Sequence, residues 1–287
     1  MELSNINNVQ NLLKKSGLSL KKSLGQNFLI DGTVCPAMAN AACDADAGVL
    51  EIGPGIGVLT RELSKKSKKV VAIEIDERLK QILSETLAEC NNVKVIYGDC
   101  MKLDLNKIIK DNFGDCRKIA VCANLPYYIT SPIIMMLLES RLPIDSITVM
   151  VQKEAAERLC ADVGTREAGT VTVAVSYYAQ KEILFGVDRS SFLPAPNVDS
   201  SVIQLKILKN PPVNVKDEEW FFKVAKACFA QRRKTLVNTV SNSLGISKDY
   251  IKAALSEMNL SETIRGEQLT LKELANLSDI LLGKPNV

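Results

Sequence analysis

The chain has 287 residues, of which 46% are apolar and 24% charged, values typical of a globular protein with a well-buried core. Its net charge of +3 excludes a uniformly basic nucleic-acid coat, although basic residues cluster at 14–22, 65–69 and 232–234. The chain contains no histidine, which excludes Ser-His-Asp and Cys-His hydrolases and HExxH metalloproteases.

The first twenty-five residues are predicted to form a basic N-terminal arm, and they contain no apolar segment of the kind found in signal peptides. The longest purely apolar run, residues 133–138, is too short to span a bilayer. We therefore expect a cytoplasmic protein with no membrane contact. The eight cysteines form no CxxC pair, so we expect them to be reduced packing residues and expect no metal site.

Short β-rich runs alternate with helical stretches between residues 48 and 152. Five strands are predicted, at residues 49–52, 70–75, 93–97, 119–123 and 147–151. Residues 77–90, which lie between the second and third strands, have the apolar spacing of a helix. This alternation is typical of βαβ units, so it predicts an α/β fold with a parallel sheet and helices on both faces.

The remainder of the chain changes character. Residues 171–178 and 201–208 are predicted to be two more strands, and only a proline-bearing loop separates them, so this end of the sheet is expected to be antiparallel. Helices are predicted at 217–240, 248–258 and 271–282, the last with a capping box of Thr270 and Glu273. Asn210-Pro211-Pro212 breaks the pattern. We expect two domains, 1–210 and 213–287.

A glycine-rich turn contains Gly53, Gly55 and Gly57, directly after the first strand and before a helix. Glycines here let the backbone turn sharply and approach a ligand, which predicts a nucleotide site at the carboxyl end of the strand. A dinucleotide fingerprint needs glycine at position 58, where the chain has valine, and no lysine follows as in a P-loop. Packing alone is the alternative explanation for such a turn.

Acidic residues follow the next two strands. Glu74 ends the second strand, 21 residues after Gly53, and suits a bidentate hydrogen bond to ribose hydroxyls. Asp99 follows the third strand and suits an adenine amine, with Ile75 and Met101 as apolar faces for the ring. Two acids without a phosphate cradle favour S-adenosylmethionine as the ligand. Turn or capping roles for both acids are the alternative.

The fourth strand runs into the sequence NLPYYITSP, next to the first strand and therefore over the methyl donor. The Asn124 amide oxygen and the Leu125 carbonyl can accept both hydrogens of an adenine amino group, which favours a tetrahedral nitrogen aimed at the sulfonium methyl. Tyr127 offers a ring on which a flipped-out base can stack. This chemistry requires no strong base. A Pro-Tyr turn that merely packs the sheet edge is the alternative.

These blocks together resemble the ribosomal RNA adenine dimethyltransferases. The matching segments, in the order of that family, are KKSLGQNFLID, VLEIGPGIGVLT, AIEID, GDCMKLD, ANLPYYITSPII, MVQKEAAERL, FLPAPNVDSSV, CFAQRRKTLVN and RGEQLTLKELANL. They extend from about residue 20 nearly to the C-terminus.

The resemblance implies a Rossmann-like class I methyltransferase domain with a seven-stranded, mostly parallel sheet, followed by a small helical domain that binds RNA or the ribosome. It implies transfer of four methyl groups from S-adenosylmethionine to N6 of two adjacent adenosines, yielding S-adenosylhomocysteine. These adenosines lie in the 3′-terminal hairpin loop of 16S rRNA within an immature 30S particle. The enzyme is expected to act as a monomer.

The family pattern also assigns residues. Those expected at the donor site are Asn27, Leu29, Gly53, Gly55, Glu74, Ile75, Asp99, Cys100 and Asn124. Those expected at the target base are Asn124, Leu125 and Tyr127, with Phe192 as a second stacking face. Phosphate contacts are expected from Arg232, Arg233 and Lys234.

Three alternatives stay open at this point. A 23S rRNA methyltransferase of the macrolide-resistance type has a similar first domain, although NLPYYITSP and an expected FAQRRKTL helix favour the small-subunit enzyme. A mainly non-catalytic ribosome-assembly factor would not need the Asn124–Tyr127 block. A nicotinamide-dependent oxidoreductase is disfavoured by Val58.

Overall fold

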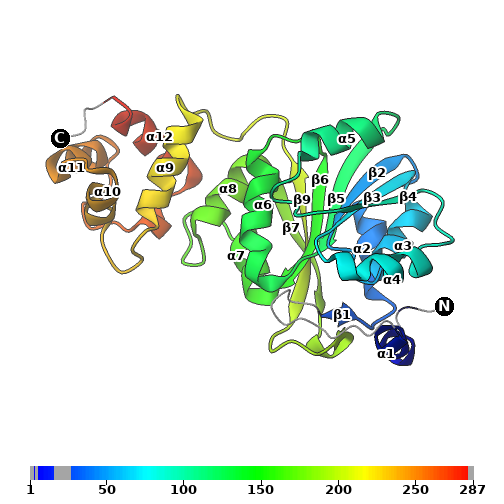
Figure 1. Ribbon diagram of the computed structural model, residues 1–287. Coiled ribbons are helices and arrows are strands. Elements are labelled where there is room, and N and C mark those ends of the chain that lie inside the picture. The colour runs from blue at the N-terminus through cyan, green and yellow to red at the C-terminus, as the bar shows by residue number, and fades with distance from the viewer. Residues whose placement is uncertain (1–2, 4–5, 16–26, 284–287) are drawn as a thin grey trace. The chain divides into compact units, whose positions relative to one another are not determined.

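The computed structural model describes residues 3, 6–15 and 27–283, and most of the predicted N-terminal arm lies outside this part (Figure 1). The chain forms two compact units: Met1–Ala156 with Glu182–Ile207, and Glu157–Lys181 with Leu208–Val287. The second unit begins near the expected boundary at 210–213 but also takes a segment from inside the expected first domain. The two-domain division at 210–213 stays a prediction.

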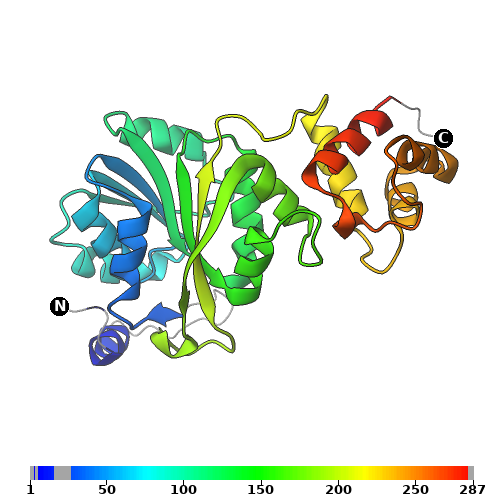
Figure 2. The same cartoon turned by 180° about the vertical axis from the view of Figure 1, so that it is seen from behind.

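A seven-stranded sheet has the strand order β4-β3-β2-β5-β6-β9-β7, as Figures 1 and 2 show. Its strands are β2 (Ala47–Ile52), β3 (Lys69–Glu74), β4 (Val93–Tyr97), β5 (Lys118–Asn124), β6 (Ser146–Gln152), β7 (Ala179–Val187) and β9 (Ser200–Ile207). Strands β2 to β6 pair in parallel, whereas β9 is antiparallel to β6. The predicted α/β class with a mostly parallel seven-stranded sheet is confirmed.

Helices cover both faces of this sheet. In chain order, the helical elements between β1 and β7 are α2 (Val34–Ala42), α3 (Val58–Lys66), η2 (Glu77–Leu79), α4 (Lys80–Thr86), α5 (Leu105–Phe113), η3 (Tyr127–Ile129), α6 (Thr130–Glu139), α7 (Lys153–Cys160) and α8 (Thr170–Tyr178), of which α8 belongs to the second unit. Figures 1 and 2 show α6 on one face and α2 on the other. Every residue of β2 is buried, which explains why this strand lacks the alternation of a half-exposed strand.

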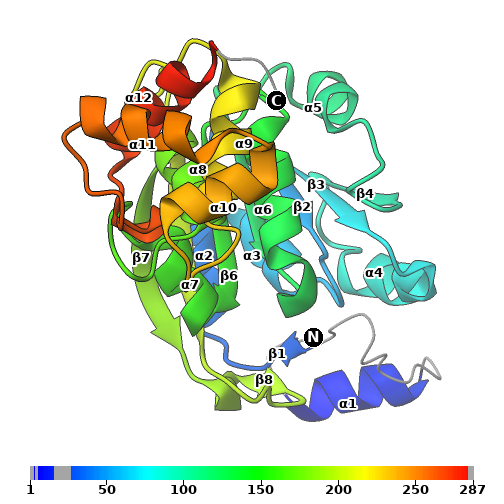
Figure 3. The same cartoon turned by 90° about the vertical axis from the view of Figure 1, so that its left-hand side faces the viewer.

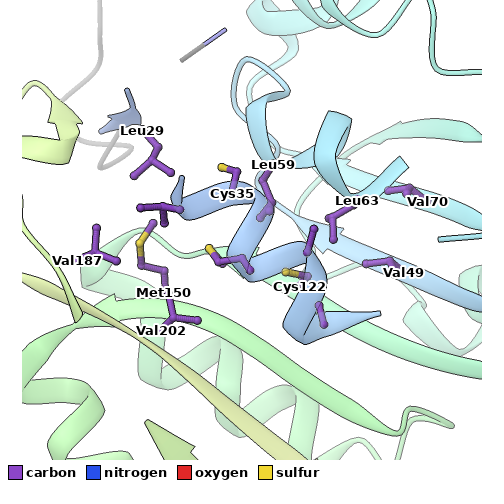
Figure 4. Packing of buried hydrophobic residues seen from close by; sticks show 14 of the residues in the cluster. Leu29, Cys35, Val49, Leu59, Leu63, Val70, Cys122, Met150, Val187 and Val202 are labelled. Carbon is purple, nitrogen blue, oxygen red and sulfur yellow. The ribbon is translucent and has the colours of Figure 1, made fainter. Parts of the chain in front are cut away.

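The core beneath the carboxyl edge of the sheet is formed by α2, α3 and the central strands (Figure 4). Met38 is completely buried, and Cys122 and Met150 approach it from β5 and β6. Leu29 and Phe192 close the same cluster from β1 (Phe28–Leu29) and β8 (Phe192–Leu193). These two short strands pair antiparallel and are seen side by side in Figure 3. A densely packed core therefore holds the carboxyl ends of the central strands in place from below.

The N-terminal helix α1 (Ile6–Lys15) packs on a second apolar cluster. Its Val9 and Leu12 are buried together with Phe28, Ile56 and Leu79. The exposed pair that links Lys15 Nζ to Glu85 at 3.3 Å contributes little, because solvent screens surface ion pairs. Apolar burial therefore contributes more than this ion pair to holding α1 in place.

The prediction of a strand at residues 171–178 is wrong, because these residues form α8. The hydroxyl of Thr172 accepts the Gly169 N–H at 2.9 Å and donates to the Arg158 carbonyl at 2.7 Å. A short apolar run rich in valine and tyrosine reads like a buried strand, and periodicity cannot separate it from a helix that is buried on most sides.

The rest of the second unit is helical, as predicted. Its elements after β9 are α9 (Glu218–Cys228), α10 (Leu236–Leu244), α11 (Lys248–Glu257), η5 (Gly266–Gln268) and α12 (Leu271–Leu281). The capping box of Thr270 and Glu273 is confirmed. The single helix expected at 217–240 is wrong, because the chain leaves the helix at residues 229–235, which contain all but the last residue of the FAQRRKTL motif. None of the described helices has the length and apolarity needed to cross a bilayer.

Candidate active site

A hollow of about 130 Å³ lies in the first unit at the carboxyl ends of β2, β3 and β5. This is where open parallel sheets bind their ligands. Segments from across the first unit line it, namely Asn27–Leu29, the glycine turn, Glu74 and Ile75, Asn124–Tyr128, and Phe192. Of the predicted donor-site and target-base residues, only Asp99 and Cys100 do not line this hollow.

The glycine turn forms one wall of the hollow. Gly53, Gly55 and Gly57 have φ values of 72°, 59° and 89°, a region that residues with a Cβ rarely adopt. A Cβ on Gly53 would meet no atom within 4 Å, so this glycine leaves backbone open to the hollow. The turn therefore leaves room for a ligand to approach the backbone closely, and the predicted binding of a nucleotide there stays a prediction.

Glu74, at the end of β3, is 4% exposed and has its carboxylate held by the backbone. Its oxygens accept the N–H of Gly55 at 3.2 Å and the N–H of Asp76 at 2.8 Å. Burial raises the pKa of Glu74, and the two backbone hydrogen bonds oppose that rise. These two hydrogen bonds fix the orientation of a carboxylate that lines the hollow.

Asp99 and Cys100 lie just past the end of β4, next to the end of β3, where Gly98 N–H donates to the Glu74 carbonyl at 2.8 Å. The Asp99 carboxylate accepts the Met101 N–H at 3.0 Å, which is the turn role considered as the alternative. Burial raises the pKa of the Cys100 thiol to about 11. These two residues stand at the rim of the strand ends, outside the hollow itself.

Asn124 and Leu125 present two hydrogen-bond acceptors at the end of β5. Leu125 is anchored by its N–H, which donates to the Met150 carbonyl at 3.3 Å, and its side chain is 2% exposed. Among the described residues, none donates to the Asn124 side-chain oxygen or to the Leu125 carbonyl. An anchored backbone with two such acceptors is compatible with the binding of an amino group, which stays a prediction.

The two tyrosines that follow have different environments. The Tyr127 hydroxyl lies 2.8 Å from Ser200 Oγ, and Ser200 is buried at the start of β9. Burial raises the pKa of Tyr127, so its phenol stays protonated near neutral pH. Tyr128 also lines the hollow but is 62% exposed.

Phe192 is 3% exposed, because β8 pairs with β1 and sets Phe192 opposite Leu29. Both residues line the hollow from the core side. The predicted role of Phe192 as a stacking face therefore applies only to the part of its ring that borders the hollow. Asn27, just before β1, is half-buried and lines the same wall.

Glu51 was not among the predicted site residues, although it lines the hollow. It is 1% exposed, and its Oε2 has no hydrogen-bond partner in the part of the chain that the structure describes. Burial raises the pKa of Glu51 to about 8. The signal in the sequence is the single acid in an otherwise apolar strand, AGVLEI, directly before the glycine turn.

The predicted phosphate contacts belong to the second unit. Arg232, Arg233 and Lys234 are exposed in the turn between α9 and α10. Arg232 Nη2 donates to the Arg166 carbonyl at 2.7 Å, so this guanidinium already has a structural role. Arg233 and Lys234 remain the more available cations of the three.

Comparison with known proteins gives relatives over nearly the whole chain. The family model described as "Ribosomal RNA adenine dimethylase" matches residues 17–279. The protein named "Ribosomal RNA small subunit methyltransferase A" of Geobacillus thermodenitrificans is 49% identical over 94% of both chains. The protein of the same name from Bacillus mycoides is 46% identical over 98% of both.

Two solved structures are similar as well. A dimethyladenosine transferase from Plasmodium falciparum has a TM-score of 0.72 at 28% identity, covering 87% of this chain and 95% of its own. The 23S rRNA methyltransferase ErmE has a TM-score of 0.67 at 27% identity, covering 89% of this chain and 99% of its own. The sequence match, the fold and the lined hollow agree, and the chain belongs to the ribosomal RNA adenine dimethylase family.

Proposed function

We propose that this protein transfers methyl groups from S-adenosylmethionine to N6 of two adjacent adenosines in the 3′-terminal hairpin loop of 16S rRNA. The product is N6,N6-dimethyladenosine, formed during assembly of the small ribosomal subunit. The observation that carries the proposal is the pair of acceptors on the border of the hollow, Asn124 Oδ1 and the Leu125 carbonyl, which receive no hydrogen bond from the described residues. Family membership and the names of the relatives support the same substrate class.

The residues around the hollow fit the methyl donor. The Glu74 carboxylate is oriented by its two backbone hydrogen bonds and would accept hydrogen bonds from the ribose hydroxyls. The glycine turn would lie against the methionine part of the donor. Glu51 offers a buried carboxyl group with one oxygen, Oε2, unpaired among the described residues, which suits the donor's ammonium group because a buried acid needs a cation nearby to ionise. Ile75, 56% exposed, would cover the adenine ring, and Asp99 would accept from its amine.

When bound, S-adenosylmethionine supplies an electrophilic methyl group on sulfur. The protein's part is alignment. Asn124 and Leu125 would each take one N–H of the target amine, which turns the nitrogen lone pair toward the donor, and the Tyr127 ring would hold the base by stacking. After transfer the extra proton can leave to water, so no basic side chain is needed at the nitrogen. This agrees with a chain that has no histidine.

The RNA would be positioned by exposed cations of the second unit. Arg233 and Lys234 are both exposed, and contacts of this kind to phosphate fix the register of an RNA hairpin without reading its sequence. Loop adenosines cost less to extrude than paired ones, which suits a hairpin-loop target. We infer that the protein acts as a cytoplasmic monomer on the immature 30S particle.

The decisive experiment supplies labelled S-adenosylmethionine and small subunits that lack the modification, followed by digestion and identification of the nucleoside. We expect N6,N6-dimethyladenosine in 16S rRNA and no label in isolated large subunits. Label in 23S rRNA would favour the macrolide-resistance type of enzyme, and no label in either would favour a non-catalytic assembly factor.

The same assay tests the acceptor pair. Asn124→Ala should lower the rate of transfer about 10²-fold or more, the size of effect seen when one aligned hydrogen-bonding group is removed from an active site. Asn124 is also expected at the donor site, but Glu51 and Glu74 are untouched, so donor binding should weaken far less than turnover. Asn91→Ala, at an exposed asparagine outside the hollow, is the matched control. Normal turnover by Asn124→Ala would refute the proposed role of the amide.

A further inference from the structure

Tyr128 has the most exposed large apolar side chain in the described part of the protein, at 62%. Exposed apolar side chains are common when scattered, but this one borders the same hollow as Asn124 and Leu125. Its ring carries no charge, and the structure gives its hydroxyl no hydrogen-bond partner among the described residues. Packing within the protein therefore does not account for an aromatic ring at this position.

The backbone that carries Tyr128 is held firmly. Tyr128 is the middle residue of the single-turn helix η3, in which the Pro126 carbonyl accepts the Ile129 N–H at 3.1 Å and the Thr130 hydroxyl at 3.2 Å. On the other side, the Leu125 N–H donates to the Met150 carbonyl. The ring is thus presented from a fixed base, so little backbone freedom is lost when a ligand binds to it.

The geometry of η3 separates the two tyrosine rings. A 3₁₀-helix has about three residues per turn, so consecutive side chains point roughly 120° apart. The Tyr127 ring is half-buried and tied to Ser200, whereas the Tyr128 ring is free at the rim. One base cannot stack on both rings at once. A ligand for the Tyr128 ring would therefore be a second planar group.

We propose that Tyr128 is a stacking platform for the nucleotide next to the target adenosine in the RNA strand. This inference rests on the proposed function, because it assumes that the target base enters beside Asn124 and Tyr127. Bases of single-stranded loops stack on exposed aromatic side chains, and the interaction needs no hydrogen bonds. With two adjacent adenosines as targets, the platform holds one adenine while the other is at the donor.

The rival ligand for the ring is the adenine of the methyl donor, because Ile75 borders the same hollow and is also exposed. The two ligands make opposite predictions. A ring that stacks on the donor affects the dissociation constant of S-adenosylmethionine measured without RNA. A ring that stacks on the neighbouring nucleotide affects the KM for small subunits and leaves donor binding unchanged.

The first experiment compares Tyr128→Ala and Tyr128→Phe with wild type, using full-length protein and unmethylated small subunits. Tyr128→Ala should lower kcat/KM about tenfold, through KM for the subunits, as expected from the loss of one base–aromatic stack. Tyr128→Phe should behave like wild type, because the face of the ring is kept. Ile183→Ala is the matched control, since Ile183 is 44% exposed on β7 and does not line the hollow.

The second experiment removes the partner instead of the ring. Small subunits reconstituted with an abasic residue on the 5′ or the 3′ side of the target adenosine are compared with normal subunits. One of these two substitutions should slow wild-type enzyme about as much as Tyr128→Ala does, and the variant should show no further loss on that substrate. This coupling is specific to contact between the ring and that base.

The outcomes separate the two proposals. If wild-type protein forms no dimethyladenosine, the proposed function fails. If wild type is active but Tyr128→Ala retains full kcat/KM, or if its penalty persists on both abasic substrates, the stacking inference is overturned while the function stands. The stacking inference is also overturned if Tyr128→Ala lowers the affinity for S-adenosylmethionine, measured without RNA, by as much as it lowers kcat/KM. That result would assign the ring to the cofactor.

Discussion

Glu51 allows a test in which cofactor binding and folding stability change in opposite directions. The carboxyl group is buried, and burial raises its pKa from 4.5 to about 8. A group whose pKa is higher in the folded state stabilises the fold fully below its unfolded pKa, and this contribution is lost as pH rises through the folded pKa. Stability that depends on Glu51 should therefore decline between about pH 4.5 and pH 8.

The magnitude follows from the pKa shift. Each unit of pKa difference is worth about 1.4 kcal/mol, so by pH 7 the buried acid lowers the free energy of unfolding by roughly 3 kcal/mol. Glu51→Gln keeps the shape but cannot ionise. We expect it to melt at a higher temperature than wild type at neutral pH, by roughly 5–10 °C, and to lose most of this advantage near pH 4.5.

The assay is thermal unfolding of ligand-free protein across this pH range, together with calorimetric titration of S-adenosylmethionine. Glu51→Gln should weaken donor binding at least about tenfold, because a charged partner for the ammonium group is lost. Glu182→Gln, at an exposed position on β7, should change neither property. A Gln variant with wild-type melting at every pH and unchanged donor affinity would show that Glu51 is neither strained by burial nor part of the donor site.

Three further predictions use the same assays. Glu74→Ala should weaken S-adenosylmethionine binding about tenfold or more, because the hydrogen bonds to ribose are lost; an unchanged dissociation constant would contradict the ribose assignment. Ser200→Ala should reduce kcat/KM about fivefold, because it removes a hydrogen bond to Tyr127 worth ~1 kcal/mol. Ser201→Ala should cause no such loss. Adding Ser200→Ala to Tyr127→Phe should also cause no further loss, because that hydrogen bond is already absent. Arg233→Ala should weaken binding to small subunits and reduce the salt dependence of log K by about 0.7–0.9; a slope equal to that of wild type would remove Arg233 from the phosphate contacts.

The sequence was most informative where burial forces a simple pattern. Mostly apolar, fully buried strands such as β2 predicted the parallel sheet, and the turn that follows has the positive φ values that its glycines Gly53 and Gly55 suggested. It was least informative where tertiary contacts decide. Residues 229–235 contain no proline or glycine, yet the helix stops there, and the Leu236 N–H donates to the distant Ile264 carbonyl.

The candidate site shows the same division. Asn124 and Tyr127 could be predicted because an amide, a proline and a ring at the end of a strand have few structural uses. The unused Oε2 of Glu51 could not, because whether an acid in a strand finds a partner depends on the residues packed above it. Phe192 was predicted as a second stacking face, but its pairing with Leu29 across β1 and β8 is a long-range contact that no local pattern reveals.

The packing of α1 has a practical consequence for anyone preparing this enzyme. Phe28, Ile56 and Leu79 border the hollow on one side and rest on Val9 and Leu12 of α1 on the other. A shortened version that starts at the KKSLGQNFLID segment would leave these walls facing water, although no residue of α1 borders the hollow. Inhibitor affinities measured on such a truncated enzyme would describe a pocket whose walls have lost their support, so screening should use protein that keeps α1.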